Sequence, residues 1–106
     1  MTSKFAGMLG LAARAGRIST GEFSAEKSIK SGKAKLCILA SDASENTRKH
    51  FRDMCGYRRI PCVTVDVNKT ELGHMAGRGD RTSVTVDDTG FAESLGIIIE
   101  GGTAHE

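Results

Sequence analysis

The chain has 106 residues, of which 39% are hydrophobic and 26% charged, and a mass of 11.3 kDa. A chain this short buries about two-thirds of its unfolded surface, so it has material for a single core. The composition excludes a disordered or fibrous protein, and the apolar runs are too short for a membrane-spanning helix. The N-terminus also makes a poor signal peptide, so we expect a cytoplasmic protein.

The charged residues are unevenly distributed along the chain. Residues 1–60 hold twelve Lys and Arg and five Asp and Glu, a net charge of +7, whereas residues 61–106 hold three and eight, a net charge of −5. Such unlike halves within one domain predict an electropositive face, which is typical of proteins with a polyanionic partner. The alternative is that both sets are solvated surface.

The N-terminal third predicts two helices joined by a short extended segment. Apolar residues recur at helical spacing over residues 4–15, and Gly16 is a natural end for that helix. Ser19 and Glu22 have the spacing of a capping box. In this motif the side chain of each of the two residues accepts a hydrogen bond from the backbone N–H of the other. They predict a second helix that begins near residues 20–22 and ends at Ser31 and Gly32.

The middle of the chain predicts two strands around a third helix. Residues 36–40 form a continuous apolar run, which is typical of a strand buried on both faces. Asp42 and Glu45 form another capping box, so a helix should begin there and continue to about Met54. Residues 62–66 predict the next strand.

The C-terminal third predicts a short helix, a strand and a last helix. Asn68 and Glu71 have capping-box spacing, and Ser83–Val86 alternates in the manner of a strand. Asp87 and Asp88 are adjacent carboxylates, and a helix cap is the simplest role for one of them. The last helix therefore begins at Asp88 or Thr89.

Helices and strands alternate throughout, which predicts an α/β protein with a largely parallel or mixed sheet. We expect one domain over residues 1–100 and a flexible tail over residues 101–106. The apolar residues 97–99 should be held against the core.

Sequence motifs give no support for catalysis or for a cofactor. The glycines of residues 73–79 follow a helix rather than a strand, so we interpret them as a helix end and a turn. Three cysteines, Cys37, Cys55 and Cys62, show no Cys-x-x-Cys spacing, and the histidines offer no paired spacing either. We therefore expect reduced, buried thiols and no metal site.

Basic residues gather around the second predicted helix. Lys27 and Lys30 lie on it, and Lys33 and Lys35 follow it. The beginning of the helix, next to Gly21, presents unpaired backbone N–H groups that attract phosphate. We expect these groups to lie near one end of the protein and to bind RNA; the alternative is a solvated lysine face.

Several blocks of the sequence resemble a known family. They are LGLAARAG at 9–16, GEFSAEKSIKSGKAKLCILASDAS at 21–44, SDASENT at 41–47, ELGH at 71–74 and GRGDR at 77–81. In this order they resemble the ribosomal L7Ae family of kink-turn RNA-binding proteins, in particular its bacterial YlxQ-like branch, over about residues 3–97. The resemblance implies a three-layer α/β/α sandwich with a mixed, mostly four-stranded central sheet. It also implies a small non-catalytic protein that binds structured RNA, such as ribosomal RNA.

In the kink-turn binders of this family, the second helix begins with Gly-x-Asn-Glu-x-x-Lys, in which Asn and Glu contact guanines and Lys supports the RNA backbone. By position, Gly21 and Lys27 match this motif, Glu22 fills the variable position, and Phe23 and Ser24 replace Asn and Glu. Phenylalanine cannot pair with a guanine edge, although it can stack on an exposed base. We favour Phe23 as a core residue, because its apolar neighbours on the helix look inward.

The family's second RNA-binding element corresponds here to residues 80–85. In this loop Arg81 can meet phosphate, and Thr82 and Ser83 can donate hydrogen bonds. The candidate RNA-binding residues are therefore Gly21, Glu22, Phe23, Ser24, Lys27, Lys30, Lys33, Arg81, Thr82 and Ser83.

Two other functions stay open at this point. A protein-interaction module could keep the fold without kink-turn recognition and use Phe23 as an exposed apolar contact. An enzyme subunit would need a deep pocket with convergent polar groups, lined by His74 or Cys55.

Overall fold

The computed structural model describes residues 3–103 and contains five α-helices and four strands within that range. They alternate along the chain as the sequence predicts. The elements are α1 (Ser3–Arg14), β1 (Ile18–Thr20), α2 (Glu22–Lys30), β2 (Leu36–Leu39), α3 (Glu45–Tyr57), β3 (Cys62–Thr64), α4 (Lys69–Met75), β4 (Ser83–Val86), α5 (Thr89–Ile98) and a π-helical turn, η1 (Ile99–Thr103).

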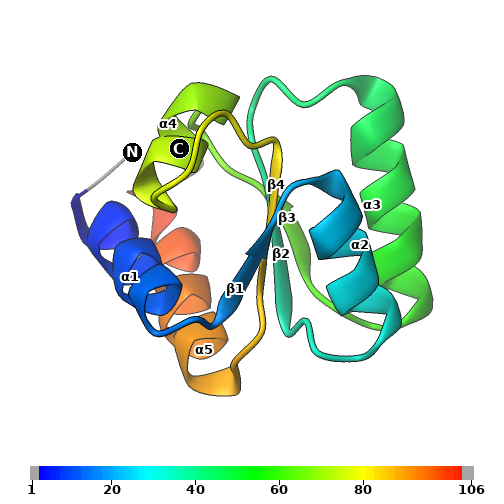
Figure 1. Ribbon diagram of the computed structural model, residues 1–106, viewed down its shortest axis with the longest axis horizontal. Coiled ribbons are helices and arrows are strands. Elements are labelled where there is room, and N and C mark those ends of the chain that lie inside the picture. The colour runs from blue at the N-terminus through cyan, green and yellow to red at the C-terminus, as the bar shows by residue number, and fades with distance from the viewer. Residues whose placement is uncertain (1–2, 104–106) are drawn as a thin grey trace.

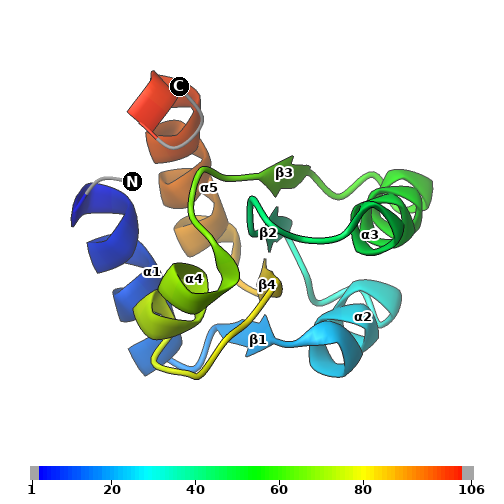
Figure 2. The ribbon, with the colours of Figure 1, turned by 90° about the horizontal axis from the view of Figure 1, so that it is seen from above.

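The strands form one mixed sheet in the order β1-β4-β2-β3. Strands β2 and β3 are parallel, and β4 is antiparallel to both of its neighbours, β1 and β2. Helices α2 and α3 cover one face of the sheet, and α1, α4 and α5 cover the other (Figures 1 and 2). This arrangement confirms the three-layer α/β/α sandwich with a four-stranded sheet.

Each face of the sheet has its own hydrophobic core, and β2 contributes to both. Leu36 and Ile38 pack among side chains of α1, β4 and α5. Cys37 and Leu39 point to the opposite face and pack against residues of α2 and α3, including Phe51. Because successive side chains of a strand alternate between faces, a continuous apolar run is what this central strand requires.

Strand register brings two distant parts of the chain together at one end of the sheet. Thr20, the last residue of β1, is paired with Val84, and Leu39, the last residue of β2, is paired with Ser83. The beginning of β4 is therefore next to the end of β1. The loop that precedes β4 consequently lies beside the start of α2 (Figure 1).

Two of the predicted helix caps are confirmed. At α4, Asn68 Oδ1 accepts a hydrogen bond from the Glu71 N–H at 2.8 Å, and Glu71 Oε1 accepts one from the Asn68 N–H at 2.9 Å. At α5, Asp88 Oδ2 accepts a hydrogen bond from the Phe91 N–H at 2.9 Å. Each cap joins residues three apart, so local sequence was sufficient to find it.

The other two predicted capping boxes are wrong, because their first residues form hydrogen bonds with residues far away in the sequence. Ser19 donates its hydroxyl hydrogen bond to Asp87 Oδ2 at 2.6 Å, and α2 begins after Gly21 instead. Asp42 Oδ1 accepts a hydrogen bond from the Lys69 N–H at 2.9 Å. The cap of α3 is Ser44, two residues after the predicted position.

The C-terminal prediction is correct in part. Ile99 is buried against the core, but Ile97 is 71% exposed. Residues 101–103 continue the helical path as part of η1 rather than a loose tail, and residues 104–106 lie outside the described residues. None of the helices in residues 3–103 is long and apolar enough to cross a membrane.

Candidate functional site

The start of α2 presents backbone donors with no side-chain cap. Its N-cap residue is Gly21, and within residues 3–103 no side chain caps this end of the helix. Gly21 has φ 89° and ψ 161°, a conformation that favours glycine, and its N–H donates to the Ser83 carbonyl at 3.0 Å. The first turn of α2 therefore offers N–H groups at the positive end of the helix dipole, where anions are stabilised.

A fixed guanidinium lies against this helix start. Arg81 Nε donates a hydrogen bond to Thr20 Oγ1 at 3.2 Å, and its Nη1 donates to the Asp80 carbonyl at 2.9 Å. A Cβ placed on Gly21 would come within 3.8 Å of Arg81 Nε, so the two residues are close neighbours. Because two hydrogen bonds hold the planar group, Arg81 can meet an incoming phosphate with little loss of side-chain freedom.

The two predicted elements share one pocket of about 450 Å³. It unites six of the ten predicted residues and adds Lys69, which sequence reasoning missed because it is an isolated lysine in the acidic half. The carboxylates of Glu22 and Asp80 also line it, so the pocket has mixed charge. Its full lining is Thr20, Gly21, Glu22, Phe23, Ser24, Lys69, Asp80, Arg81 and Thr82.

The loop that carries Arg81 is held by contact between two backbone segments. A Cβ on Gly73, in α4, would lie 1.8 Å from the carbonyl oxygen of Gly79. The Arg81 N–H donates to the Lys69 carbonyl at 3.0 Å, and the Arg78 N–H donates to the Gly73 carbonyl at 2.8 Å. The glycine-rich segment therefore serves close backbone packing as well as the helix end and turn that its pattern predicts.

Phe23 is 81% exposed, so the prediction that it packs into the core is wrong. The buried face of α2 is formed by Ala25, Ser28 and Ile29, which are three and four residues apart. Phe23 projects away from this face, because a helix advances 3.6 residues per turn. Lys27 lies four residues later, one turn along the same exposed side.

A second depression, of about 470 Å³, lies along this exposed side of α2. It places an aromatic ring beside two ammonium groups and a carboxylate on one helix surface. An aromatic ring can stack on a base, and a neighbouring ammonium group can bind the phosphate attached to it. The lining residues are Phe23, Glu26, Lys27, Lys30 and Ser31.

The basic cluster predicted around α2 does not gather at one end. Lys30 is the last residue of α2, about 12 Å along the helix axis from Glu22, and Lys33 follows in the loop to β2. Lys30 forms an ion pair with Glu26 at 2.7 Å. This ammonium and the His50 ring lower the pKa of Glu26 below its ordinary value. Lys30 is therefore partly neutralised by a carboxylate of its own helix.

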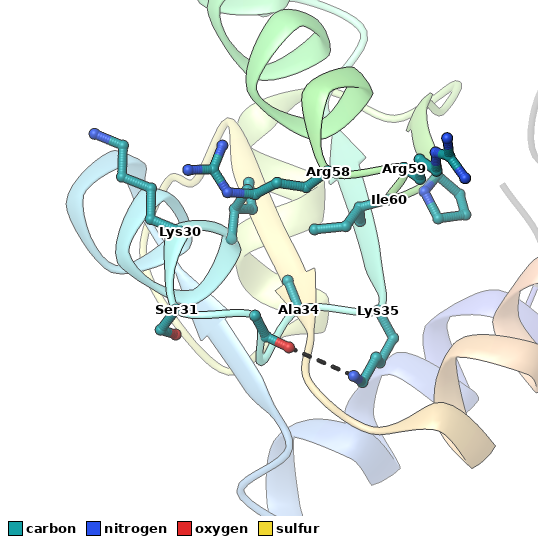
Figure 3. A pocket seen from close by; sticks show the side chains of 10 residues that line it. Lys30, Ser31, Ala34, Lys35, Arg58, Arg59 and Ile60 are labelled. Carbon is teal, nitrogen blue, oxygen red and sulfur yellow. Dashed lines mark hydrogen bonds between the residues drawn. The ribbon is translucent and has the colours of Figure 1, made fainter.

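Lys30 also borders a pocket of about 430 Å³ at the opposite end of α2 from Gly21. In Figure 3, Lys30 comes from the end of α2 and Lys35 from the loop that leads to β2, whereas Arg58 and Arg59 come from the turn between α3 and β3. Lys35 Nζ donates to the Gly32 carbonyl at 3.4 Å, as the dashed line shows. The basic residues thus form two separate groups, one at each end of α2.

Ser83 lies in the predicted interface but cannot donate its hydroxyl to RNA. It is fully buried in β4. Its backbone carbonyl accepts a hydrogen bond from the Gly21 N–H, and this bond holds the start of α2 against β4. Thr82 is half-buried and lines the pocket directly.

His74, one of the two residues named for a possible enzyme pocket, lies between α1 and α4 in a pocket of about 330 Å³. Arg14 and Arg78 also line this pocket, and its lining contains no carboxylate or thiol.

The three cysteines converge, which their spacing along the chain did not predict. Their Sγ atoms all lie within 4.8 Å of one another, and none forms a disulfide. Cys37 and Cys55 are buried as expected, whereas Cys62 is only half-buried. Hydrogen bonds from the Cys37 and Cys62 thiols lower the pKa of Cys55, with a further contribution from Arg58.

Comparison with known proteins identifies the family. The sequence profile of the ribosomal protein L7Ae/L30e/S12e/Gadd45 family matches residues 3–96. The chain is 41% identical to "RNA-binding protein YlxQ" of Bacillus subtilis over 83% of this chain and 87% of the relative. It is 38% identical to a protein of the same name from Enterococcus faecium, over 89% of each.

Solved structures agree with this result. A protein of unknown function from Bacillus halodurans is 38% identical, with a TM-score of 0.88 over 93% of this chain and 99% of that one. A Giardia lamblia 15.5kD RNA binding protein shares the fold, with a TM-score of 0.76 and 20% identity over 92% and 83% of the two chains. A profile match over nearly the whole chain and two bacterial relatives near 40% identity lead to one conclusion. The chain belongs to the ribosomal protein L7Ae/L30e/S12e/Gadd45 family.

Proposed function

We propose that this protein is a non-catalytic RNA-binding protein that recognises structured RNA, including ribosomal RNA, at the pocket between the start of α2 and the α4–β4 loop. The observation that carries this proposal is the position of Arg81. Its guanidinium is fixed beside the uncapped first turn of α2, so charged and neutral donors point into one pocket. Relatives of this family are named for RNA binding and for the large ribosomal subunit, which supports the same conclusion.

Three groups of residues contact different parts of the RNA. Arg81 and the N–H groups of the first turn of α2 bind phosphate oxygens. Lys27, one turn further along α2, neutralises the backbone as it passes over the exposed side of the helix. Phe23 stacks on an unpaired base, because its ring is exposed and every base offers a face for stacking.

Recognition of the RNA depends on shape and stacking more than on guanine edges. Phe23 and Ser24 stand where the family's kink-turn motif has Asn and Glu, and a phenyl ring offers no donor or acceptor. The preferred target is an internal loop or kink-turn that presents an unstacked base beside a sharp bend in the backbone. A filter-binding assay should therefore show tighter binding to a kink-turn RNA than to a regular duplex of equal length. Equal affinity for the two RNAs would contradict recognition of structure.

Replacement of Lys27 with alanine should weaken RNA binding and reduce the salt dependence of the affinity. Each phosphate contact contributes close to one unit to the slope of log K against log salt concentration, so we expect the slope to fall by about one. Filter-binding titrations at several salt concentrations measure this slope. Lys49→Ala removes an exposed helical lysine on α3 that pairs with Asp53, and should leave the slope unchanged. An unaltered slope in Lys27→Ala would remove Lys27 from the interface.

Replacement of Phe23 with alanine should weaken RNA binding without reducing the melting temperature. Loss of one base–aromatic stack costs about 1–3 kcal/mol, which corresponds to an affinity loss of about 5- to 150-fold. The fold should be unaffected, because the ring is 81% exposed. Tyr57→Ala on α3 is the matched control, since Tyr57 is equally exposed and outside the pocket.

The exposure of Phe23 also favours a second candidate function, a protein-interaction module that keeps the fold. An exposed aromatic ring is a common anchor in protein interfaces. The Phe23→Ala measurement separates the two functions. If RNA affinity is unchanged while capture of a partner protein is lost, Phe23 serves protein binding.

A further inference from the structure

The thiol groups of Cys37, Cys55 and Cys62 form a cluster that RNA binding does not use. They come from three different elements, β2, α3 and β3, and are separated by up to 25 positions in the chain. Cys37 and Cys62 are paired neighbours across the parallel strands, and Cys55 reaches them from the helix above. The cluster belongs to the core on the α2 and α3 side of the sheet, and none of the three cysteines lines the pocket that contains Arg81.

Two simpler explanations account for the cluster less completely. Cysteines often fill cores as small apolar side chains, but that role does not require three sulfur atoms to meet. A disulfide would use two of the thiols and leave the third without a function. Binding of one ion uses all three, because each thiolate supplies one ligand atom to a common centre.

The separation of the sulfur atoms suits a small ion at their centre. An ion about 2.3 Å from each sulfur atom, in the plane of all three, requires them to lie about 4 Å apart. The Sγ atoms of the cluster lie within 4.8 Å of one another, so small side-chain rotations reach that spacing. We propose that Cys37, Cys55 and Cys62 together bind one soft, thiophilic monovalent cation, Cu(I), in a three-coordinate site.

The ligand set favours Cu(I) over Zn²⁺. Soft thiolate ligands suit both ions, but structural zinc sites are almost always closed by four protein ligands. The potential ligand group found within residues 3–103 has three members. Cys37 and Cys55 are at most 1% exposed, so water has poor access to a fourth position except from the side of Cys62.

Two guanidinium groups lie near enough to offset part of the negative charge of such a site. Three thiolates and one Cu(I) carry a net charge of −2, and each thiol that is protonated beforehand releases its proton to solvent on binding. Arg58, which follows α3, acts electrostatically on Cys55, and Arg52 on α3 acts on Cys62. The neighbouring Cys55 thiol and burial nevertheless raise the pKa of Cys37 and Cys62, so the ion has to displace their protons when it binds. A bound ion would join β2, α3 and β3, and so stabilise the folded protein over the unfolded chain.

The test is a competition titration of the reduced, full-length protein with Cu(I) under anaerobic conditions against a chromogenic Cu(I) chelator. We expect one Cu(I) per chain and a higher melting temperature in its presence. Each of Cys37→Ser, Cys55→Ser and Cys62→Ser should weaken binding at least about 100-fold, more than loss of an outer-shell partner usually costs. Bound Cu(I) should also protect Cys62, the most exposed of the three, from alkylation.

Cys62→Ser keeps the test decisive if the buried variants fail to fold, because Cys62 is only half-buried. Retained Cu(I) affinity in folded Cys62→Ser would overturn the proposal. So would binding of several ions per chain with no change in melting temperature, which indicates independent surface sites. Tighter binding of Zn²⁺ than of Cu(I) in parallel competition assays would also overturn it, since that preference requires a fourth ligand.

Discussion

Replacement of Gly73 with alanine should strongly destabilise the protein, because the fold leaves no room for a methyl group at this position. The new Cβ would lie 1.8 Å from the Gly79 carbonyl oxygen and 2.7 Å from its carbonyl carbon. Both neighbours are backbone atoms, so the clash cannot be relieved by rotation of a side chain. Overpacking of this kind costs about 1–3 kcal/mol and sometimes more, and the severity of this clash places the expected cost at the upper end.

Thermal unfolding measures this effect directly. A loss of about 2–3 kcal/mol should lower Tm by about 10 °C or more in a domain of this size. Gly56→Ala is the matched control, because Gly56 is also helical and a Cβ there meets nothing within 4 Å. That change should be neutral or stabilising by up to about 1 kcal/mol. An unchanged Tm in Gly73→Ala would show that Gly73 and Gly79 do not hold the loop by close contact.

The same variant links stability to function. The segment that packs on Gly73 leads directly to Arg81, whose N–H is bound to the Lys69 carbonyl. If the loop moves to relieve the clash, the Arg81 guanidinium leaves the start of α2. RNA affinity should therefore fall in the folded fraction of Gly73→Ala, and the control variant should bind RNA like the original protein.

Replacement of Asp87 with alanine should also be strongly destabilising. Its carboxylate accepts hydrogen bonds from three hydroxyl groups: Ser19 at 2.6 Å, Ser28 at 2.6 Å and Thr85 at 3.0 Å. These bonds connect β1, α2 and β4 through one side chain. Ser28 and Thr85 are buried, so alanine would leave two buried hydroxyls without this acceptor, at about 1–3 kcal/mol each.

Denaturant unfolding should show a loss of about 3 kcal/mol or more in Asp87→Ala, with an unchanged m-value. Asp66→Ala is the control, because Asp66 is an exposed carboxylate next to β3 and should change stability by less than about 0.5 kcal/mol. Asp87→Asn should lie between the two, since an amide keeps one acceptor oxygen but loses the other. Equal stability of Asp87→Ala and Asp66→Ala would show that the three hydroxyls find other acceptors.

The structure brings together the two elements that the sequence predicted as a binding surface, but two side chains lie elsewhere than expected. The resemblance indicated that Gly21 and Arg81 belong to one surface, and the structure places them in contact. Phe23 was expected in the core because Ala25 and Ile29 face inward, but they lie two and six positions further along the helix, so they point to a different side of it. Lys30 was expected near the start of α2, yet it is the last residue of that helix and borders the pocket that Arg58 lines.

The amino-acid sequence alone determined the order of helices and strands, the buried central strand and the caps at Asn68 and Asp88. These features depend on residues a few positions apart, and local periodicity and capping chemistry are enough to specify them. The role of Asp87 and the meeting of three thiols depend on pairs separated by up to 68 positions. Such contacts are set by strand order and register, because these place distant residues side by side. Local patterns in the sequence do not specify which distant residues will meet.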